Sequence, residues 1–280
     1  TITNVDIYYK TSAGGSDNTI VLNDGGHVNG GNSYTWTIAV PDEKTETAYI
    51  KVADAAHPSD IYSVTTVPFS IRPVITVSVP ALDQNIEVGT SNNTVTWNIN
   101  STKVGKVDLY YSTTGQGGTF DQPISTLGVL TGQGNTSYTT WGPVLDTISG
   151  DVVIKVRDKS NDVVNDNVYG LSSSFDIIGK ITVNEPHLNE NILSGSAKTI
   201  SWTKQGTLGN VRIFYKHDGS FDPTPIAVVD SNVFSSYAWN PVPAQIENAL
   251  QVKVIQQASE GTADEVLGLS ADFNIIGQFT

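Results

Sequence analysis

The chain has 280 residues, enough for two or three domains of ordinary size, and only 15% of them are charged. It contains no cysteine, which excludes disulfides, zinc–thiolate sites and cysteine nucleophiles, and its net charge of −13 argues against nucleic acid as a partner. No apolar stretch approaches the roughly 20 residues that a membrane-spanning helix needs. We expect an extracellular or cell-surface protein, and a secreted protein without disulfides is usually bacterial or archaeal.

Short segments rich in Val, Ile, Thr and Tyr alternate between apolar and polar positions, which predicts β-strands. In chain order, the first four anchors are residues 5–9, 34–36, 50–52 and 69–71. They return at 107–111, 138–141, 154–156 and 175–177, and again at 211–215, 237–239, 252–254 and 273–275. Their order never changes and their period is about 100 residues, which indicates a repeat of whole domains.

Two further strands open the second and third copies, at residues 75–80 and 94–97 and at residues 181–186 and 199–202. The tryptophans of these strands, Trp97 and Trp202, occupy equivalent positions, and we predict that both are core residues. The first copy has no room for such strands ahead of Val5. We therefore expect its opening strands to be missing, its sheet edge and half of its core to be open, and the chain to be cut from a longer array.

The repeat predicts an all-β fold of tandem immunoglobulin-like β-sandwiches. The expected domains are a truncated sandwich over residues 1–73 and two complete sandwiches over residues 74–179 and 180–280. The last strand of each copy runs almost directly into the first strand of the next, around Pro73 and Gly179. Because one to three linker residues cannot behave as a flexible coil, we expect a stiff or modestly bent rod.

The order of these motifs resembles that of a known family. The motifs are similar to those of the Ser/Thr-rich cell-wall domain of fungal GPI-anchored, KNH-like proteins. In chain order they are I-x-V-x-x-P, T-[VI]-x-W, V-x-[IL]-x-Y, Y-x-W, [VI]-K-V and S-x-x-F-x-I. Similar domains occur in tandem in prokaryotic surface or S-layer proteins. The resemblance covers nearly all of copies two and three, and copy one from its third strand. It implies a cell-surface location and a tandem architecture, and it brings no catalytic residues.

The sequence shows no catalytic machinery. The four histidines, His27, His57, His187 and His217, lie at different places in their repeats, and we interpret them as exposed loop residues. A G-x-S-x-G nucleophile elbow and a phosphate-binding P-loop are both absent. We predict that the chain is not an enzyme.

Aromatic side chains at equivalent positions offer one route to ligand binding. Tyr8, Tyr110 and Phe214 fall on the face of their strands opposite the expected core, where they are predicted to be exposed. Such rings can stack on sugars. The other interpretation is that they pack against a neighbouring strand or loop.

The loop before the last strands of the second copy is rich in oxygen ligands. Its carboxylates Asp158, Asp162 and Asp166 are the predicted ligands of a Ca²⁺ ion that would stiffen the rod. The other copies keep the acidic character of this loop without its spacing. Solvated acidic loops in which Asn and Asp serve turn geometry are therefore the alternative.

These observations predict a structural protein of a surface layer or cell wall. Its expected partners are other copies of itself or cell-wall glycans. The alternative function is an adhesin or an array of carbohydrate-binding modules, attached to an enzyme that lies outside these residues.

Overall fold

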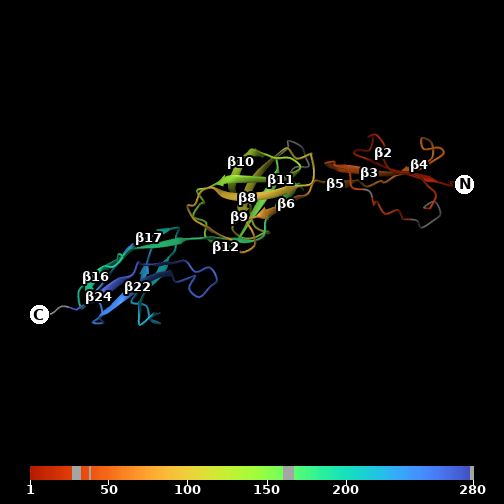
Figure 1. Ribbon diagram of the computed structural model, residues 1–280. Coiled ribbons are helices and arrows are strands. Elements are labelled where there is room, and N and C mark those ends of the chain that lie inside the picture. The colour runs from red at the N-terminus through yellow and green to blue at the C-terminus, as the bar shows by residue number, and fades with distance from the viewer. Residues whose placement is uncertain (27–32, 38, 160–166, 278–280) are drawn as a thin grey trace.

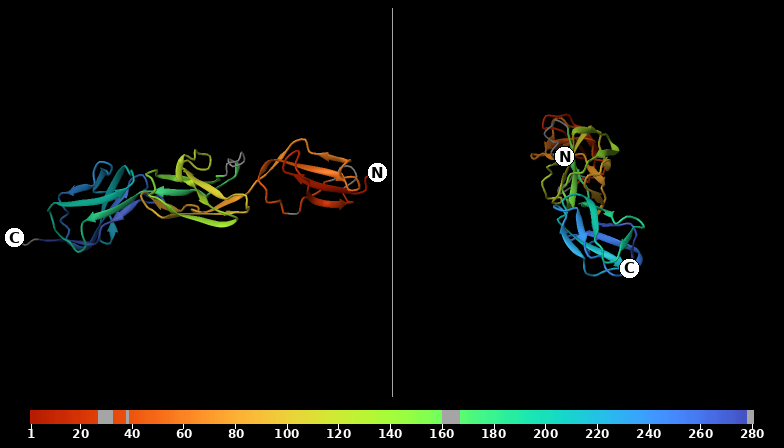
Figure 2. Two further views of the ribbon diagram at one scale, coloured as in Figure 1. Left: turned by 90° about the horizontal axis from the view of Figure 1, so that it is seen from above. Right: turned by 90° about the vertical axis from the view of Figure 1, so that its left-hand side faces the viewer.

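The computed structural model describes residues 1–26, 33–37, 39–159 and 167–277. Its strands fall into three groups arranged one after another along an elongated molecule, with the two termini at opposite ends (Figures 1 and 2). Within the described residues no strand pairing passes from one group to the next, and no residue lies in an α-helix. We call the groups the first unit (residues 5–71), the second unit (75–178) and the third unit (180–276).

The second unit is a sandwich of two sheets. Its strands are β6 (Ile75–Val79), β7 (Asn85–Glu87), β8 (Asn93–Ile99), β9 (Lys106–Ser112), β10 (Gln122–Leu130), β11 (Gly134–Trp141), β12 (Ser149–Asp158), β13 (Tyr169–Leu171) and β14 (Phe175–Ile178). One sheet has the order β11-β8-β6, and the other has the order β10-β9-β12-β14-β7 with β13 on β12. Trp97 of β8 is fully buried between the two sheets, as predicted.

The third unit repeats this arrangement. Its strands are β15 (Lys180–Glu185), β16 (Asn191–Leu193), β17 (Lys198–Gln205), β18 (Asn210–His217), β19 (Ser220–Phe221), β20 (Ala227–Asp230), β21 (Ser236–Trp239), β22 (Glu247–Gln256), β23 (Leu267–Leu269) and β24 (Phe273–Ile276). The sheet β15-β17-β21 packs on the sheet β16-β24-β22-β18-β19, which also carries β20 and β23. Trp202 of β17 is 1% exposed, which confirms it as a core residue.

The first unit differs from the other two because its described residues form a single sheet. Its strands are β1 (Val5–Lys10), β2 (Asn18–Asp24), β3 (Thr45–Asp54), β4 (Tyr62–Val64) and β5 (Phe69–Ile71). They follow the order β2-β1-β3-β4, with β5 also on β3. The consequence for packing is clear at one pair of equivalent positions, because Val52 is 39% exposed while Val156 is fully buried.

Alternation of side chains along each strand explains the paired sheets, since every second residue faces the partner sheet. In β9, Val107, Leu109 and Tyr111 all join the core of the second unit. The prediction of an all-β fold of tandem immunoglobulin-like sandwiches in a rod is confirmed.

Candidate functional site

At both junctions a carboxylate at the end of one unit meets a loop of the next unit, the loop between β8 and β9 at the first junction and the loop between β17 and β18 at the second. Asp42, three residues before β3, accepts hydrogen bonds from the Thr102 backbone N–H at 2.9 Å and from its hydroxyl at 2.5 Å. The Ser101 hydroxyl donates to the other oxygen of Asp42. Asp146, three residues before β12, accepts from the Thr207 N–H at 3.1 Å and its hydroxyl at 2.6 Å. We call this arrangement the Asp–Thr clasp.

The two clasps occupy equivalent positions in the repeat. Thr102 follows Trp97 by five residues, and Thr207 follows Trp202 by five residues. The donors of the next unit hold the pKa of Asp42 below its ordinary value, with the Ser101 hydroxyl contributing most. The same Asp–Thr pairing therefore recurs at both junctions, although both Thr102 donors bond one oxygen of Asp42 and the two Thr207 donors bond different oxygens of Asp146.

The loop predicted to bind calcium lies at the first junction. The Asp158 side chain is fully buried, and its Oδ2 lies 2.8 Å from the Lys44 ammonium of the first unit, which is only 8% exposed. Asp162 and Asp166 lie outside the described residues. An ammonium group beside Asp158 already supplies the positive charge that a buried carboxylate requires. In this structure Asp158 thus acts as an ion-pair partner between units.

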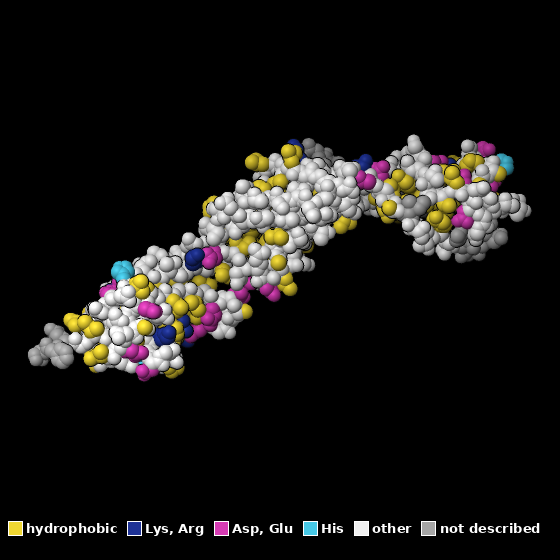
Figure 3. Space-filling model, viewed as in Figure 1, with side chains coloured by type: hydrophobic (Ala, Val, Ile, Leu, Met, Phe, Trp, Pro, Cys, Tyr) yellow, Lys and Arg dark blue, Asp and Glu magenta, His cyan; other side chains and the backbone are white. Residues whose placement is uncertain are grey.

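A second set of polar contacts surrounds this ion pair. The Glu46 carboxylate of β3 accepts from two nitrogens of Arg72, each at 2.8 Å, and from the Ser70 hydroxyl. The Asn167 side chain of the second unit donates to Glu46 at 3.4 Å. These donors, Arg72 first among them, lower the pKa of Glu46 to about 2. Figure 3 shows dark blue and magenta side chains together at the neck between the first and second units.

The second junction replaces the buried ion pair with uncharged groups. Ile148 stands at the position equivalent to Lys44, and Gln256 stands at the position equivalent to Asp158. The Gln256 amide donates to the Leu208 carbonyl at 3.1 Å. Gly206, with φ of +87°, lies so close to Ile148 that an added Cβ would be 2.9 Å from its Cδ1. The second junction therefore relies on close apolar packing beside its clasp.

Two polar contacts also cross the second junction. The Lys180 ammonium lies 2.8 Å from Glu87, and the Asn85 amide donates to Asp264 at 2.8 Å. Asp176 is buried nearby, and burial raises the pKa of its carboxyl, followed by repulsion from Asp264 and other carboxylates. The surroundings of Asp176 at this junction therefore favour the protonated form of its carboxyl.

The aromatic side chains considered as sugar platforms are covered by cations. The Lys51 ammonium lies 5.5 Å from the Tyr8 ring centre, and the Arg157 guanidinium lies 5.4 Å from that of Tyr110. The predicted exposure was wrong, because Tyr8 and Tyr110 are only partly exposed and Phe214 is only 3% exposed. Lys253 of the neighbouring strand lies 4.7 Å from the Phe214 ring centre. A lysine of the repeated strand thus covers this face, where its ammonium group is attracted to the aromatic ring.

The histidines divide into two kinds. The His57 and His187 side chains are 61% and 69% exposed, as expected, while His27 lies outside the described residues. The interpretation of His217 as an exposed loop residue was wrong, because it ends β18 and its ring stacks on Tyr215 at 5.1 Å.

His217 also has acidic neighbours that were not predicted from the sequence. Its Nε2 lies 2.7 Å from Asp222 and its Nδ1 lies 3.3 Å from Asp218. One ligand atom of each of His217, Asp218 and Glu247 lies within 4.8 Å of the others. Hydrogen bonding to Asp222 is the main cause that raises the pKa of His217. In the sequence, two aspartates within the five residues after His217 could have indicated these acidic neighbours.

Comparison with known proteins finds only solved structures of low sequence identity. No family model and no curated protein matches the chain. Among solved structures, fibronectin(III)-like modules of CbhA from Clostridium thermocellum are 17% identical, with coverage of 73% of this chain and 94% of that one and a TM-score of 0.24. A tetra-tandem repeat from the extending region of a large adhesion protein is 14% identical, covers 99% and 68%, and has a TM-score of 0.38.

A three-domain structure of titin, domains I67–I69 in an E-to-A mutated variant, is 8% identical, covers 98% of this chain and 88% of that one, and has a TM-score of 0.36. At such scores the fold assignment rests on the strand pairing described above. Within the described residues, no helix combines the length and the apolar character needed to cross a membrane.

Proposed function

We propose that the chain is a structural segment of an extracellular surface-layer or cell-wall protein, built of a truncated sandwich and two complete sandwich domains, divided near Pro73 and Gly179. The Asp–Thr clasp, present at both junctions, is the observation that carries this proposal. A carboxylate that accepts from both a backbone N–H and a hydroxyl of one residue constrains orientation as well as distance. Domains joined in this way keep a fixed spacing, which is what a lattice or stalk requires.

The acidic surface and the composition support the same proposal. A net charge of −13 keeps a rod soluble and limits side-by-side contact of chains until cations or specific partners are present. The proposed partners are other copies of this chain or cell-wall glycans. The motif order that resembles Ser/Thr-rich cell-wall domains supports a location at the cell surface.

The second candidate function is an adhesin or an array of carbohydrate-binding modules. One observation favours it: Tyr62 and Tyr169, at equivalent positions of β4 and β13, are 56% and 46% exposed. Each ring also has a lysine beside it, Lys51 at 4.6 Å and Lys155 at 4.1 Å. An exposed ring next to a cation is a plausible contact for an acidic sugar.

Assembly and glycan binding distinguish the two functions. The purified chain should be examined by electron microscopy on a lipid monolayer, and its binding to cell-wall polysaccharide should be measured by sedimentation. A structural role predicts ordered arrays, and these should be lost in the Asp42→Ala, Asp146→Ala double variant while its circular dichroism is unchanged. Saturable glycan binding that disappears in Tyr62→Ala and Tyr169→Ala, without any array, would instead establish the second function.

We also propose calcium as a stiffening ion, with Asp158, Asp162 and Asp166 as ligands. Because Asp158 is paired with Lys44, binding would require this carboxylate to exchange the ammonium for the ion. Calorimetric titration after chelation tests the proposal, with Lys44→Ala expected to bind more tightly than the wild type. No binding heat at millimolar Ca²⁺ in either protein would leave Asp158 with its structural role alone.

A further inference from the structure

A histidine and two carboxylates meet at the turn that joins β18 to β19. Asp218 and Gly219 have φ angles of 48° and 78°, and they form the two-residue turn of this hairpin. His217 ends β18 just before the turn, and Glu247 is the first residue of β22. The backbone N–H of Asp218 donates to the Glu247 carboxylate at 2.8 Å. The turn is therefore held against the start of β22.

The imidazole of His217 has a defined orientation. Its Nε2 lies 2.7 Å from Asp222, and its ring stacks on that of Tyr215 with centroids 5.1 Å apart. An Nε2–H that donates to a carboxylate leaves the lone pair on Nδ1, which is the form of histidine that binds a metal. Nδ1 faces the turn, where it lies 3.3 Å from Asp218 Oδ2 and 3.3 Å from the Gln245 amide nitrogen.

The three ligand atoms lie at separations that a metal ion can bridge. One atom from each of His217, Asp218 and Glu247 lies within 4.8 Å of the others. Zinc binds imidazole nitrogen and carboxylate oxygen at about 2.0–2.2 Å, so two tetrahedral ligands stand roughly 3.4 Å apart. The 3.3 Å between His217 Nδ1 and Asp218 Oδ2 already matches this value. An adjustment of at most about 1.4 Å brings Glu247 to the same separation.

The equivalent positions of the other two units hold no such ligands. All six side chains there carry a hydroxyl, namely Thr113, Thr114 and Ser149 in the second unit and Thr11, Ser12 and Thr45 in the first. Ser149 donates to the Thr113 carbonyl at 2.7 Å, and Thr45 donates to the Thr11 carbonyl at 3.0 Å. Hydroxyl-to-backbone hydrogen bonds thus suffice to hold this end of the sheet. The third unit has metal-ligating side chains at all three positions instead.

The cluster also has an excess of negative charge. The carboxylates of Asp218, Asp222 and Glu247 surround one imidazole. Within the part of the chain that the structure describes, the ion pairs of these carboxylates are with His217 alone. Carboxylates that share a site repel one another, and a bound divalent cation offsets this repulsion.

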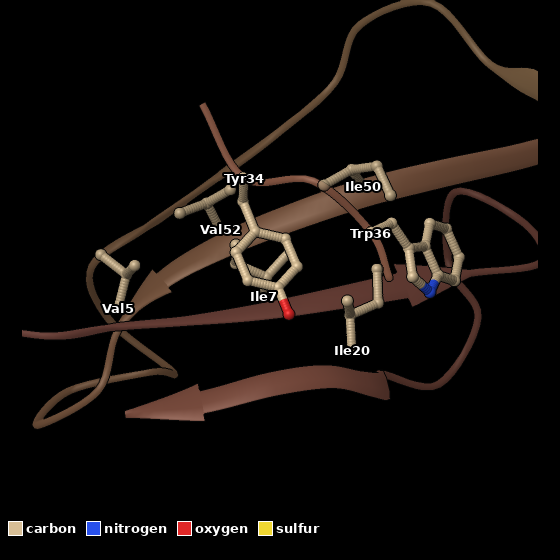
Figure 4. Close-up of a pocket in the computed structure, with 7 residues that line it drawn as sticks. All are labelled: Val5, Ile7, Ile20, Tyr34, Trp36, Ile50 and Val52. Atoms are coloured by element: carbon tan, nitrogen blue, oxygen red, sulfur yellow. The ribbon is translucent and has the colours of Figure 1, made fainter. Parts of the chain in front are cut away.

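The cavity in the first unit differs from this cluster in its chemistry. Its volume is about 330 Å³, and its described lining consists of aliphatic and aromatic side chains that include Tyr34, Trp36 and Ile50 (Figure 4). Neither an imidazole nor a carboxylate is among the described side chains that line it. The metal-ligating groups are therefore at the turn of the third unit and not in this cavity.

We propose that His217, Asp218 and Glu247 bind a divalent transition-metal ion, Zn²⁺ by its chemistry, and that Asp222 positions the imidazole. One nitrogen and two carboxylate oxygens suit Zn²⁺, whereas Ca²⁺ takes six to eight oxygen ligands. Three protein ligands leave the fourth tetrahedral position to water. The ion ties the β18–β19 turn to the start of β22 and stabilises the third unit.

The test uses the full chain, freed of metal by a chelator and titrated with Zn²⁺ in a calorimeter. One ion is expected to bind per chain, and millimolar Ca²⁺ should not displace it. Binding should raise the melting temperature of the third unit, because the ion binds only the folded state. The X-ray absorption spectrum of the zinc-loaded wild type should show nitrogen and oxygen neighbours at about 2.0–2.2 Å.

Matched variants locate the site. His217→Gln, Asp218→Asn and Glu247→Gln each remove one ligand and should weaken Zn²⁺ binding at least about tenfold. Asp222→Asn keeps all three ligands and should still weaken binding about tenfold, because the residue that orients a ligating histidine contributes to affinity. His187→Gln removes an exposed histidine of the same unit and should bind as the wild type does.

Three results would overturn the proposal. The first is the absence of binding heat at millimolar Zn²⁺. The second is binding that His217→Gln leaves unchanged or that His187→Gln weakens equally, since the ion would then be held by scattered surface groups. The third is an X-ray absorption spectrum of the wild type without a nitrogen neighbour, a result that does not depend on whether any variant folds.

Discussion

Removal of the Asp–Thr clasp should loosen a junction without unfolding a unit. Asp42→Ala removes the acceptor of three hydrogen bonds, and Asp146→Ala removes the acceptor of two. Hydrogen bonds to a charged group contribute about 1.5–3 kcal/mol when they are protected from water. Both carboxylates are exposed, so solvent screening reduces the expected loss to about 1 kcal/mol per junction. A loss of this size raises the population of open junctions roughly fivefold.

Spin labels can report this change because the chain contains no cysteine. Leu22→Cys in the first unit and Leu127→Cys in the second introduce two exposed labelling sites. The distribution of distances between the labels, measured by pulsed electron resonance, should broaden in Asp42→Ala. It should stay narrow in Asp60→Ala, which removes a carboxylate from a loop of the first unit. Equal distributions in Asp42→Ala and the wild type would refute the role given to the clasp.

Three further predictions concern single units. Trp97→Ala should destabilise the second unit by about 3–5 kcal/mol in denaturant titration, and a loss under about 1 kcal/mol would contradict its core position. Because the folded pKa of His217 is raised, its stabilisation is present below the ordinary value of 6.5 and is lost as pH rises through the raised pKa. The third unit should therefore melt at a lower temperature at pH 8 than at pH 6, and this difference should disappear in His217→Gln. Asp176 also has a raised pKa, so its carboxyl favours folding only while it is protonated. Asp176→Asn should raise the melting temperature at pH 7 and leave it unchanged near pH 3; a lower melting temperature at pH 7 would contradict this.

The positions of the strands and of the core tryptophans could be predicted from the sequence because they depend on local alternation and repetition. Trp97 and Trp202 recur at one position of the repeat, and both are buried where an alternating strand places them. The burial of Phe214 could not be predicted in this way. It lies on the opposite face of its strand and is covered by Lys253, a residue from β22, almost 40 positions further along the chain.

The junctions could not be predicted because their contacts depend on how two units are set against each other. Lys44 and Asp158 are 114 residues apart in the sequence, and nothing near either of them indicates the other. The recurrence of an aspartate three residues before β3 and β12 was visible in principle. Its role could not be predicted, because the sequence does not show that this end of a unit faces the loop that carries Thr102 or Thr207. The third unit has Ala244 at that position, so this feature varies among the copies.

Small-angle X-ray scattering of the dilute chain tests directly whether the three units form a stiff rod, because a stiff rod and a flexible string of the same domains differ in their longest dimensions. We expect a scattering profile that matches the single extended arrangement of Figures 1 and 2, with the same maximum dimension at low and at physiological salt. The Asp42→Ala, Asp146→Ala double variant should give a shorter average dimension. A wild-type profile that requires a broad mixture of bent arrangements, and that the double variant reproduces, would contradict a rod stiffened by the Asp–Thr clasps.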